Sequence, residues 1–80
     1  MKLPRSLSAA ALIKALRIYQ YEVDRQKGSH IRLTTVLNGQ HHITIPNHDE
    51  LKIGTLSSIL AEVANHLSKT KEEVSEELFG

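Results

Sequence analysis

Residues 30–46, HIRLTTVLNGQHHITIP, decide the fold because they predict two strands joined by a tight turn. In residues 30–36 and 41–45, apolar and β-branched side chains alternate with polar ones, which is typical of strands with one buried face. Asn38 and Gly39 between them favour a hairpin turn. Pro46 ends the second strand because proline has no N–H to donate to a sheet ladder. The segment therefore predicts an antiparallel hairpin.

The apolar residues of this hairpin also predict its register. Ile31 and Leu33 share a buried face with Ile43 and Ile45 only if the numbers of paired residues sum to an even number. A two-residue loop of Asn38 and Gly39 would give an odd sum and separate the two apolar sets. A three-residue loop over 37–39, a type I turn followed by a left-handed Gly39, pairs Ile31 with Ile45 and Leu33 with Ile43. The opposite, polar face then carries His30, Arg32, Thr34, His42 and Thr44.

The flanking segments predict one more strand and three helices. The strand covers residues 21–27, and the helices run to about residue 20 from a cap at Ser6 or Ser8, from about 55 to 67, and from a capping box at Thr70 and Glu73 to about 78. The order α-β-β-β-α-α predicts an α+β fold. We expect a two-layer sandwich, in which helices cover one face of a three-stranded antiparallel sheet.

Length and composition limit the class of protein. The chain has 80 residues, is 40% hydrophobic and 24% charged, and carries a net charge of +1. We expect one domain over residues 1–80, with a core at 6–67 and a C-terminal helical extension at 68–80. This size excludes a two-domain enzyme, a dinucleotide fold and a multi-pass membrane protein. Without cysteine, disulfides, thiolate metal sites and a cysteine nucleophile are also excluded.

Charge is distributed unevenly along the chain. Residues 1–56 carry eight Lys/Arg and four Asp/Glu, a net charge of +4, whereas residues 57–80 carry two and five, a net charge of −3. Three of these basic residues, Arg25, Lys27 and Arg32, lie where the strands are predicted. The basic excess would suit a polyanion such as RNA, and two solvated faces of opposite charge explain it equally well.

The N-terminal segment predicts a cytoplasmic protein without a membrane anchor. An apolar stretch at residues 7–13 follows Lys2 and Arg5, as in a signal peptide, but Lys14 and Arg17 interrupt it and no small-residue cleavage site follows. The stretch is therefore interpreted as an amphipathic helix. No apolar run approaches the roughly 20 residues that a membrane span requires.

Among the five histidines, His30 has the surroundings of a catalytic group. It follows Gly28–Ser29 on the polar face, between Lys27 and Arg32. An imidazole can transfer protons near neutral pH, and adjacent cations can hold a phosphate and stabilise developing charge. Gly28 would let the backbone approach a ligand closely. From the residues alone, however, a plain surface histidine beside basic residues is the commoner explanation.

The other histidines predict no metal site and no cofactor. His41 and His42 are adjacent on a strand and therefore point to opposite faces. A zinc site from His42, His48 and Asp49 is conceivable, but no HExxH motif or helical pair of histidines is present. His66, late in a helix, suits a structural or solvent-exposed role, and His48 suits the surface.

Three segments in sequence resemble a known family. They are residues 25–30 (RQKGSH), 43–46 (ITIP) and 52–56 (KIGTL), the last followed by 58–60 (SIL). In order and spacing, over about residues 8–67, they resemble the HicA (YcfA-like) family, the small ribonuclease toxins of type II toxin–antitoxin pairs. Two positions depart from the family pattern: Gln20 stands where glycine is frequent, and Asp24 stands where an apolar residue is common.

The resemblance implies a double-stranded-RNA-binding-domain-like α-β-β-β-α fold and an mRNA-cleaving toxin blocked by a HicB-type antitoxin. It also implies a catalytic role for the histidine of the Gly-Ser-His motif, His30. We then expect metal-independent cleavage by the ribose 2′-hydroxyl, without a cofactor. The RNA-binding residues expected around His30 are Arg25, Lys27, Gly28, Ser29 and Arg32.

Two other classes of function compete with the nuclease. The same fold and basic residues would suit a non-catalytic RNA-binding module that recognises A-form shape and 2′-hydroxyls. The chain would also suit a protein-interaction domain whose only partner is an antitoxin-like chain. An acidic C-terminal segment could assist that docking, although a solvated helix explains it more simply; its acidic residues are Glu72, Glu73, Glu76 and Glu77.

Overall fold

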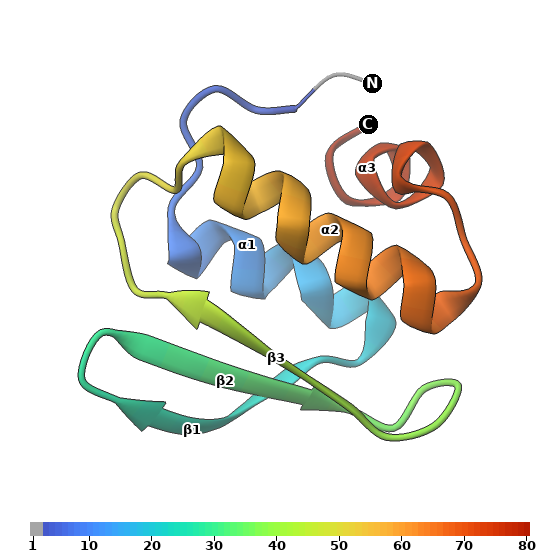
Figure 1. The fold of residues 1–80 in the computed structure, drawn as a ribbon, viewed down its shortest axis with the longest axis horizontal. Helices are drawn as coiled ribbons and strands as arrows, with labels where there is room; N and C mark the ends of the chain where they lie inside the picture. The colour runs from blue at the N-terminus through green and yellow to red at the C-terminus, as the bar shows by residue number, and fades with distance from the viewer. Residues whose placement is uncertain (1–2) are drawn as a thin grey trace.

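Helices and strands follow the predicted order in the computed structural model, which describes residues 3–80 (Figure 1). The helices are α1 (Ala9–Ala15), the 3₁₀ turn η1 (Leu16–Tyr19), α2 (Ile53–Leu67) and α3 (Lys71–Phe79). The strands are β1 (Glu22–Lys27), β2 (His30–Thr35) and β3 (His41–Pro46). The α+β class and the α-β-β-β-α order with an additional C-terminal helix are confirmed.

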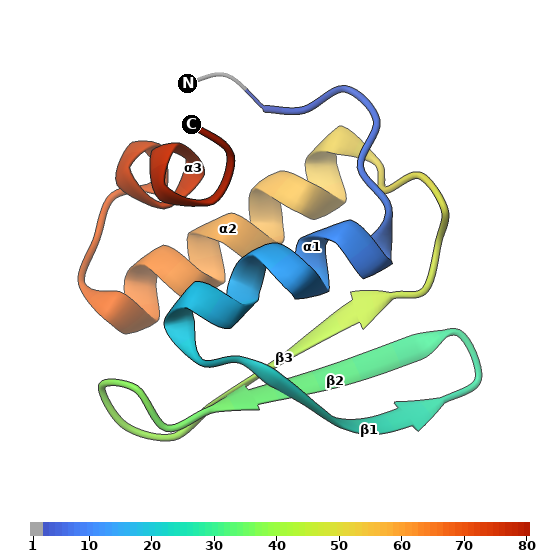
Figure 2. The ribbon, with the colours of Figure 1, turned by 180° about the vertical axis from the view of Figure 1, so that it is seen from behind.

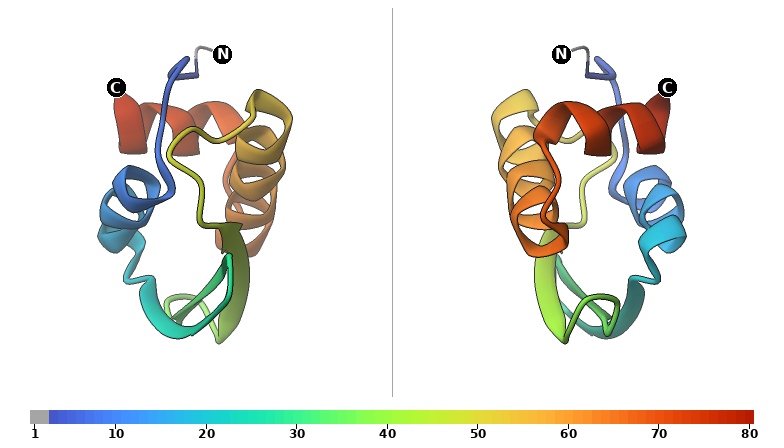
Figure 3. Two further views of the ribbon diagram at one scale, coloured as in Figure 1. Left: turned by 90° about the vertical axis from the view of Figure 1, so that its left-hand side faces the viewer. Right: turned by 90° about the vertical axis from the view of Figure 1, so that its right-hand side faces the viewer.

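The elements form a sheet layer and a helix layer. The three antiparallel strands lie in the order β1-β2-β3, with β2 in the centre. Helices α1 and α2 lie side by side over one face of the sheet, as the view from behind also shows (Figure 2). The side views show α3 crossing these two helices on the side away from the sheet (Figure 3). No helix formed by residues 3–80 covers the other face of the sheet, which we call the outer face.

The predicted register of the β2–β3 hairpin is confirmed. Ile31 pairs with Ile45 and Leu33 with Ile43, and all four side chains are buried beneath the helices. The turn itself differs from the expected one, because Asn38 as well as Gly39 has a positive φ, 58° and 96° respectively. Asparagine tolerates this backbone region.

The core is built mainly from aliphatic side chains and includes two tyrosines. Both Tyr19 and Tyr21 are buried, and Val74 of α3 is fully buried with the residues of α1 and α2. Thr35 is the buried polar residue of β2; its hydroxyl donates to the Tyr19 carbonyl at 2.7 Å and accepts the Leu37 N–H at 3.1 Å. Within residues 3–80, every buried side-chain nitrogen and oxygen has a hydrogen-bond partner.

The helix ends follow their capping residues. Ser8 caps α1, and Thr70 with Glu73 forms the predicted capping box of α3. The first helix does not run as a regular α-helix to Gln20: it tightens into 3₁₀ geometry at Leu16, and Gln20 takes the left-handed conformation, with φ 65°. Gln20 therefore fills the position of the frequent family glycine by adopting the backbone that glycine would favour. No helix in residues 3–80 has the length and apolarity to cross a membrane.

Candidate active site

His30 lies at the exposed beginning of the central strand β2. Lys27 of β1 stands directly opposite it on one side, and Pro46 of β3 on the other. Gly28 and Ser29 connect Lys27 to His30 as a two-residue turn. Gly28 has φ 57° whereas Ser29 does not have a positive φ, the pattern of a type II′ hairpin turn, which places glycine first.

The neighbour of His30 is set by a β-bulge in β1. Glu22 pairs with Thr34 and Val23 with Leu33, but after the bulge Arg25 pairs with Arg32 and Lys27 with His30. An uninterrupted ladder would instead have put Gln26 opposite His30. The extra residue is Asp24, so the expected regular strand over residues 21–27 is corrected to a bulged strand beginning at Glu22.

The Gly28–Ser29 turn is held from the β3 side. The Asn47 N–H donates to the Ser29 carbonyl at 2.7 Å, which extends the contact between β2 and β3 past the end of the strands. A Cβ placed on Gly28 would meet no atom within 4 Å. The glycine is therefore required by its backbone conformation, and the space above it is open.

Polar side chains of the outer face form one hydrogen-bonded network around Asp24. Arg32 donates to its carboxylate through Nε at 2.8 Å and Nη2 at 3.3 Å, and the Thr34 hydroxyl donates to the same carboxylate. Thr34 Oγ1 also lies 2.6 Å from His42 Nδ1. The hydrogen bond from Arg32, and then that from Thr34, lower the pKa of Asp24.

The three predicted cations therefore differ in availability. One edge of the Arg32 guanidinium is engaged by Asp24, whereas Arg25 and Lys27 are exposed and make no ion pair within residues 3–80. Lys27, next to His30, is thus the cation best placed to meet a phosphate there. Asp24 departs from the family pattern, but its pairing with Arg32 was not predicted, although opposite charges on neighbouring strands could have indicated it.

His41 and His66 belong to a structural cluster on the core side of the sheet. Their rings stack with centroids 4.3 Å apart, and His41 Nδ1 shares a hydrogen bond of 2.7 Å with the Tyr21 hydroxyl. His66 Nε2 lies 2.8 Å from the Leu37 carbonyl and 3.0 Å from that of Gly39, so it donates to both. The structural role expected for His66 and the opposite orientation of His41 and His42 are confirmed. The stacked pair was not predicted, because its members are 25 residues apart in sequence.

His48 remains a surface residue. Its carbonyl accepts the Ala9 N–H at 2.9 Å, which ties the loop after β3 to the start of α1. Within residues 3–80, no three His, Cys, Asp or Glu side chains are grouped as a metal site would require. The conceivable zinc site of His42, His48 and Asp49 is therefore not assembled.

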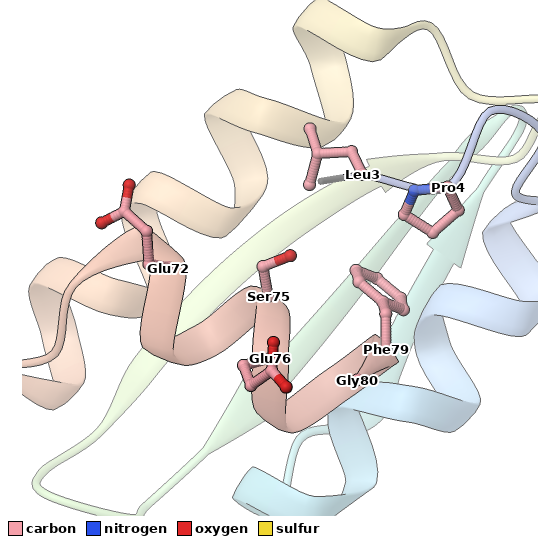
Figure 4. A pocket seen from close by; sticks show the side chains of 7 residues that line it. All are labelled: Leu3, Pro4, Glu72, Ser75, Glu76, Phe79 and Gly80. Atoms are coloured by element: carbon pink, nitrogen blue, oxygen red, sulfur yellow. The ribbon is translucent and has the colours of Figure 1, made fainter. Parts of the chain in front are cut away.

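A hollow of about 470 Å³ lies far from these residues, between the N-terminal segment and α3 (Figure 4). Leu3 and Phe79 give it an apolar wall, and Glu72 and Glu76 make it acidic. The acidic segment is also engaged within the chain, because Glu77 accepts hydrogen bonds from Tyr19 at 2.5 Å and Lys69 at 3.1 Å. An acidic hollow of this kind does not suit a phosphate-bearing ligand.

Comparison with known proteins identifies the family. The model of the family described as HicA toxin of bacterial toxin–antitoxin matches residues 9–64. Comparisons with curated proteins and with solved structures give no match. The matched region includes the whole sheet, the Gly28–Ser29 turn and His30, and it covers more than half of the 80 residues. The chain therefore belongs to the HicA family of bacterial toxins.

Proposed function

We propose that this chain is a ribonuclease toxin that cleaves mRNA in the cytoplasm, with His30 as its catalytic residue and a HicB-type antitoxin as its inhibitor. One observation carries the proposal. The imidazole of the Gly-Ser-His motif stands on the outer face, exposed, with Lys27, which has no ion pair within residues 3–80, directly across the ladder. An exposed proton-transfer group beside a free cation suits a phosphodiester, which needs a mobile proton and charge neutralisation.

The reaction uses a nucleophile that the RNA itself supplies. The ribose 2′-hydroxyl attacks the adjacent phosphorus, the bond from O2′ to phosphorus forms, and the bond from phosphorus to O5′ breaks. The products are a 2′,3′-cyclic phosphate and a 5′-hydroxyl. His30 either takes the proton of the 2′-hydroxyl or donates one to the leaving O5′, and solvent exchanges the other proton.

Lys27 would neutralise the charge that develops on the phosphate oxygens. Residues opposite each other on neighbouring strands have Cβ atoms about 5 Å apart, so both side chains can reach one phosphate. Arg25 would attract the RNA backbone over a longer range, and the free edge of Arg32 could hold a neighbouring phosphate. Gly28 and Ser29 would present His30 beneath open space for the RNA. These roles require neither a metal ion nor a cofactor.

The test compares two exposed histidines. Purified wild type, His30→Ala and the matched control His48→Ala are incubated with RNA, with and without EDTA. We expect cleavage by wild type and by His48→Ala in both conditions, a 2′,3′-cyclic phosphate end, and no cleavage by His30→Ala at an unchanged Tm. Cleavage retained by His30→Ala would remove His30 from the chemistry. If EDTA abolishes activity and a divalent ion restores it, the metal-independent mechanism is wrong and the reaction needs a metal ion.

One observation favours the non-catalytic alternative. His42 lies opposite Thr34, four residues from His30, which is about 13 Å along the strand. The two imidazoles therefore cannot form an acid–base pair on one phosphate. A single catalytic group typically contributes only about 10²–10⁴-fold. An RNA-binding module would give gel shifts with both wild type and His30→Ala, and cleavage with neither.

The antitoxin belongs to the same experiment. If a HicB-type antitoxin blocks the outer face, adding the purified product of a neighbouring antitoxin gene should suppress both cleavage and RNA binding. Cleavage that continues at saturating antitoxin would contradict this part of the proposal.

A further inference from the structure

The protons of the Asp24 network can be assigned from its hydrogen bonds. Asp24 is ionised at neutral pH, because its hydrogen bonds lower its pKa, and it can therefore only accept. The Thr34 hydroxyl has one hydrogen, which it donates to Asp24. The remaining contact, 2.6 Å between Thr34 Oγ1 and His42 Nδ1, then requires a proton on Nδ1 of His42.

This assignment determines what His42 presents to a ligand. In a neutral imidazole with its proton on Nδ1, Nε2 is a bare hydrogen-bond acceptor. The His42 side chain is 43% exposed, so both Nε2 and the ring are accessible from the outer face. Thr34 Oγ1, 2.6 Å from Nδ1, orients the ring and is itself held by its hydrogen bond to Asp24, whose carboxylate lies 3.8 Å from Nδ1.

The charge around His42 disfavours a phosphate there. Arg32 directs one edge of its guanidinium to Asp24, and a phosphate that approached His42 itself would meet the Asp24 carboxylate, 3.8 Å from Nδ1. An aromatic ring with an acceptor nitrogen instead suits a nucleobase, which can stack on the ring and donate from an amino group. The chemistry therefore indicates recognition of a base.

The position of His42 separates this contact from the cleaved bond. His42 and His30 share the outer face, about 13 Å apart along it. A single strand crossing the sheet would thus bring one phosphate to His30 and a different nucleotide to His42.

We propose that His42, oriented by Thr34 and Asp24, binds a nucleobase of the RNA strand at a nucleotide other than the one that is cut. The inference rests on the proposed function only in assuming that RNA crosses the outer face. Asp24 and Thr34 are positioning residues, and His42 makes the contact.

The test measures coupling between His42 and individual bases. The probes are 2′-O-methyl hexanucleotides, which lack the attacking hydroxyl and so cannot be cut by the proposed mechanism. One probe carries all six bases, and each of the others has an abasic nucleotide at one position. Affinities are measured for wild type, His42→Ala and the control His48→Ala. In wild type and in His48→Ala, one abasic position should weaken binding about fivefold or more, the equivalent of ~1 kcal/mol for a stacked base. In His42→Ala the abasic nucleotide at that position should not weaken binding.

A second variant tests the relay. Thr34→Val removes the hydroxyl and should shift the His42 ring away from the Nδ1-protonated tautomer in ¹⁵N spectra, with partial loss of the same coupling. Equal abasic costs in wild type and His42→Ala would overturn the inference. A salt dependence of log Kd that falls by about 0.7 in His42→Ala would also overturn it, since that is the signature of a lost phosphate contact. If the intact hexanucleotide fails to bind wild type, the proposed RNA function itself fails. If the hexanucleotide binds but His42→Ala leaves the effect of every abasic position unchanged, only the assignment of the base contact to His42 is wrong.

Discussion

Lys27 stands directly opposite His30 because Asp24 is inserted as an extra residue in β1. The same insertion brings the Asp24 carboxylate to Arg32 on the outer face, 2.8 Å from its Nε. Among the described residues, this β-bulge therefore leaves a cation without an ion pair beside the proposed catalytic imidazole and pairs the cation two residues further along β2 with a carboxylate. Bulges are used in this way to re-aim side chains next to functional sites.

Replacement of Asp24 should strengthen RNA binding at the expense of the order around His42. Asp24→Ala frees the second edge of the Arg32 guanidinium for a phosphate. We expect tighter binding to long RNA at low salt, and a salt dependence of log Kd that is steeper by about 0.7. The pair is solvent-exposed, so Tm should change little. Glu22→Ala is the matched control, because it changes the net charge equally without touching Arg32. If both variants bind RNA alike, the effect comes from overall charge and not from Arg32.

Adding a side chain at Gly28 should destabilise the protein because of the backbone conformation at this residue. Gly28→Ala meets no neighbouring atom within 4 Å, but φ is +57°, where L-residues are disfavoured by roughly 1–2 kcal/mol. Gly54→Ala is the matched control: it lies in α2, also meets nothing within 4 Å, and should be neutral or stabilising by about 0.5–1 kcal/mol. Denaturant unfolding measures both variants. Equal free energies of unfolding for the two would show that the turn does not depend on glycine.

The contrast between the two hairpins shows what could be predicted from the sequence. In β2 and β3, alternate residues such as Ile31 and Ile45 are apolar and must face the core. A shift of the strand register by one residue would therefore expose the apolar side chains of one strand. In β1 all six residues are exposed. No burial constraint therefore fixes its register, and its alternating pattern gave no sign of the bulge at Asp24. The outer-face position expected for His30 was predicted from the β2–β3 hairpin, whereas its opposite neighbour depended on the less constrained strand.

Contacts between segments that are distant in the sequence could not be predicted from local sequence patterns. The stacked rings of His41 and His66 depend on how the end of α2 lies over the β2–β3 loop. Asn38 contributes to the same contact, because its side-chain amide donates to the His66 carbonyl at 2.8 Å. Neither His41 nor His66 lies in a sequence motif from which this contact could be predicted.

This histidine cluster should make stability depend on pH. Desolvation, and then the proximity of His66, lower the pKa of His41 below its ordinary value of 6.5, against a smaller opposing effect of Glu62 and alongside a further lowering by His42. The unfolded chain therefore binds a proton at His41 more readily than the folded chain does. The free energy of unfolding should be highest above about pH 6.5 and fall as the pH drops below it.

A glutamine substitution isolates the contribution of His41. Thermal or denaturant unfolding at pH 7.5 and pH 5.5 should show a smaller loss of stability for His41→Gln than for wild type, because glutamine keeps a polar partner for Tyr21 and does not titrate. His48→Gln should behave like wild type. An unchanged pH dependence in His41→Gln would assign the acid sensitivity to another group.

Helix α3, which follows the family-matched residues 9–64, should be required for a stable core. Val74 is fully buried, and Leu78 and Phe79 pack against the same cluster. Val74→Ala removes two methyl groups and leaves a cavity, which should cost about 2 kcal/mol of unfolding free energy. Glu76→Ala, exposed on the same helix, is the control and should change stability little. Because Val74 lies on the side of the helix layer away from the outer face, RNA cleavage below the lowered Tm should persist in Val74→Ala. An unchanged Tm in Val74→Ala would mean that α3 contributes little to the stability of the domain. Loss of cleavage in a variant that still folds would mean that α3 influences His30.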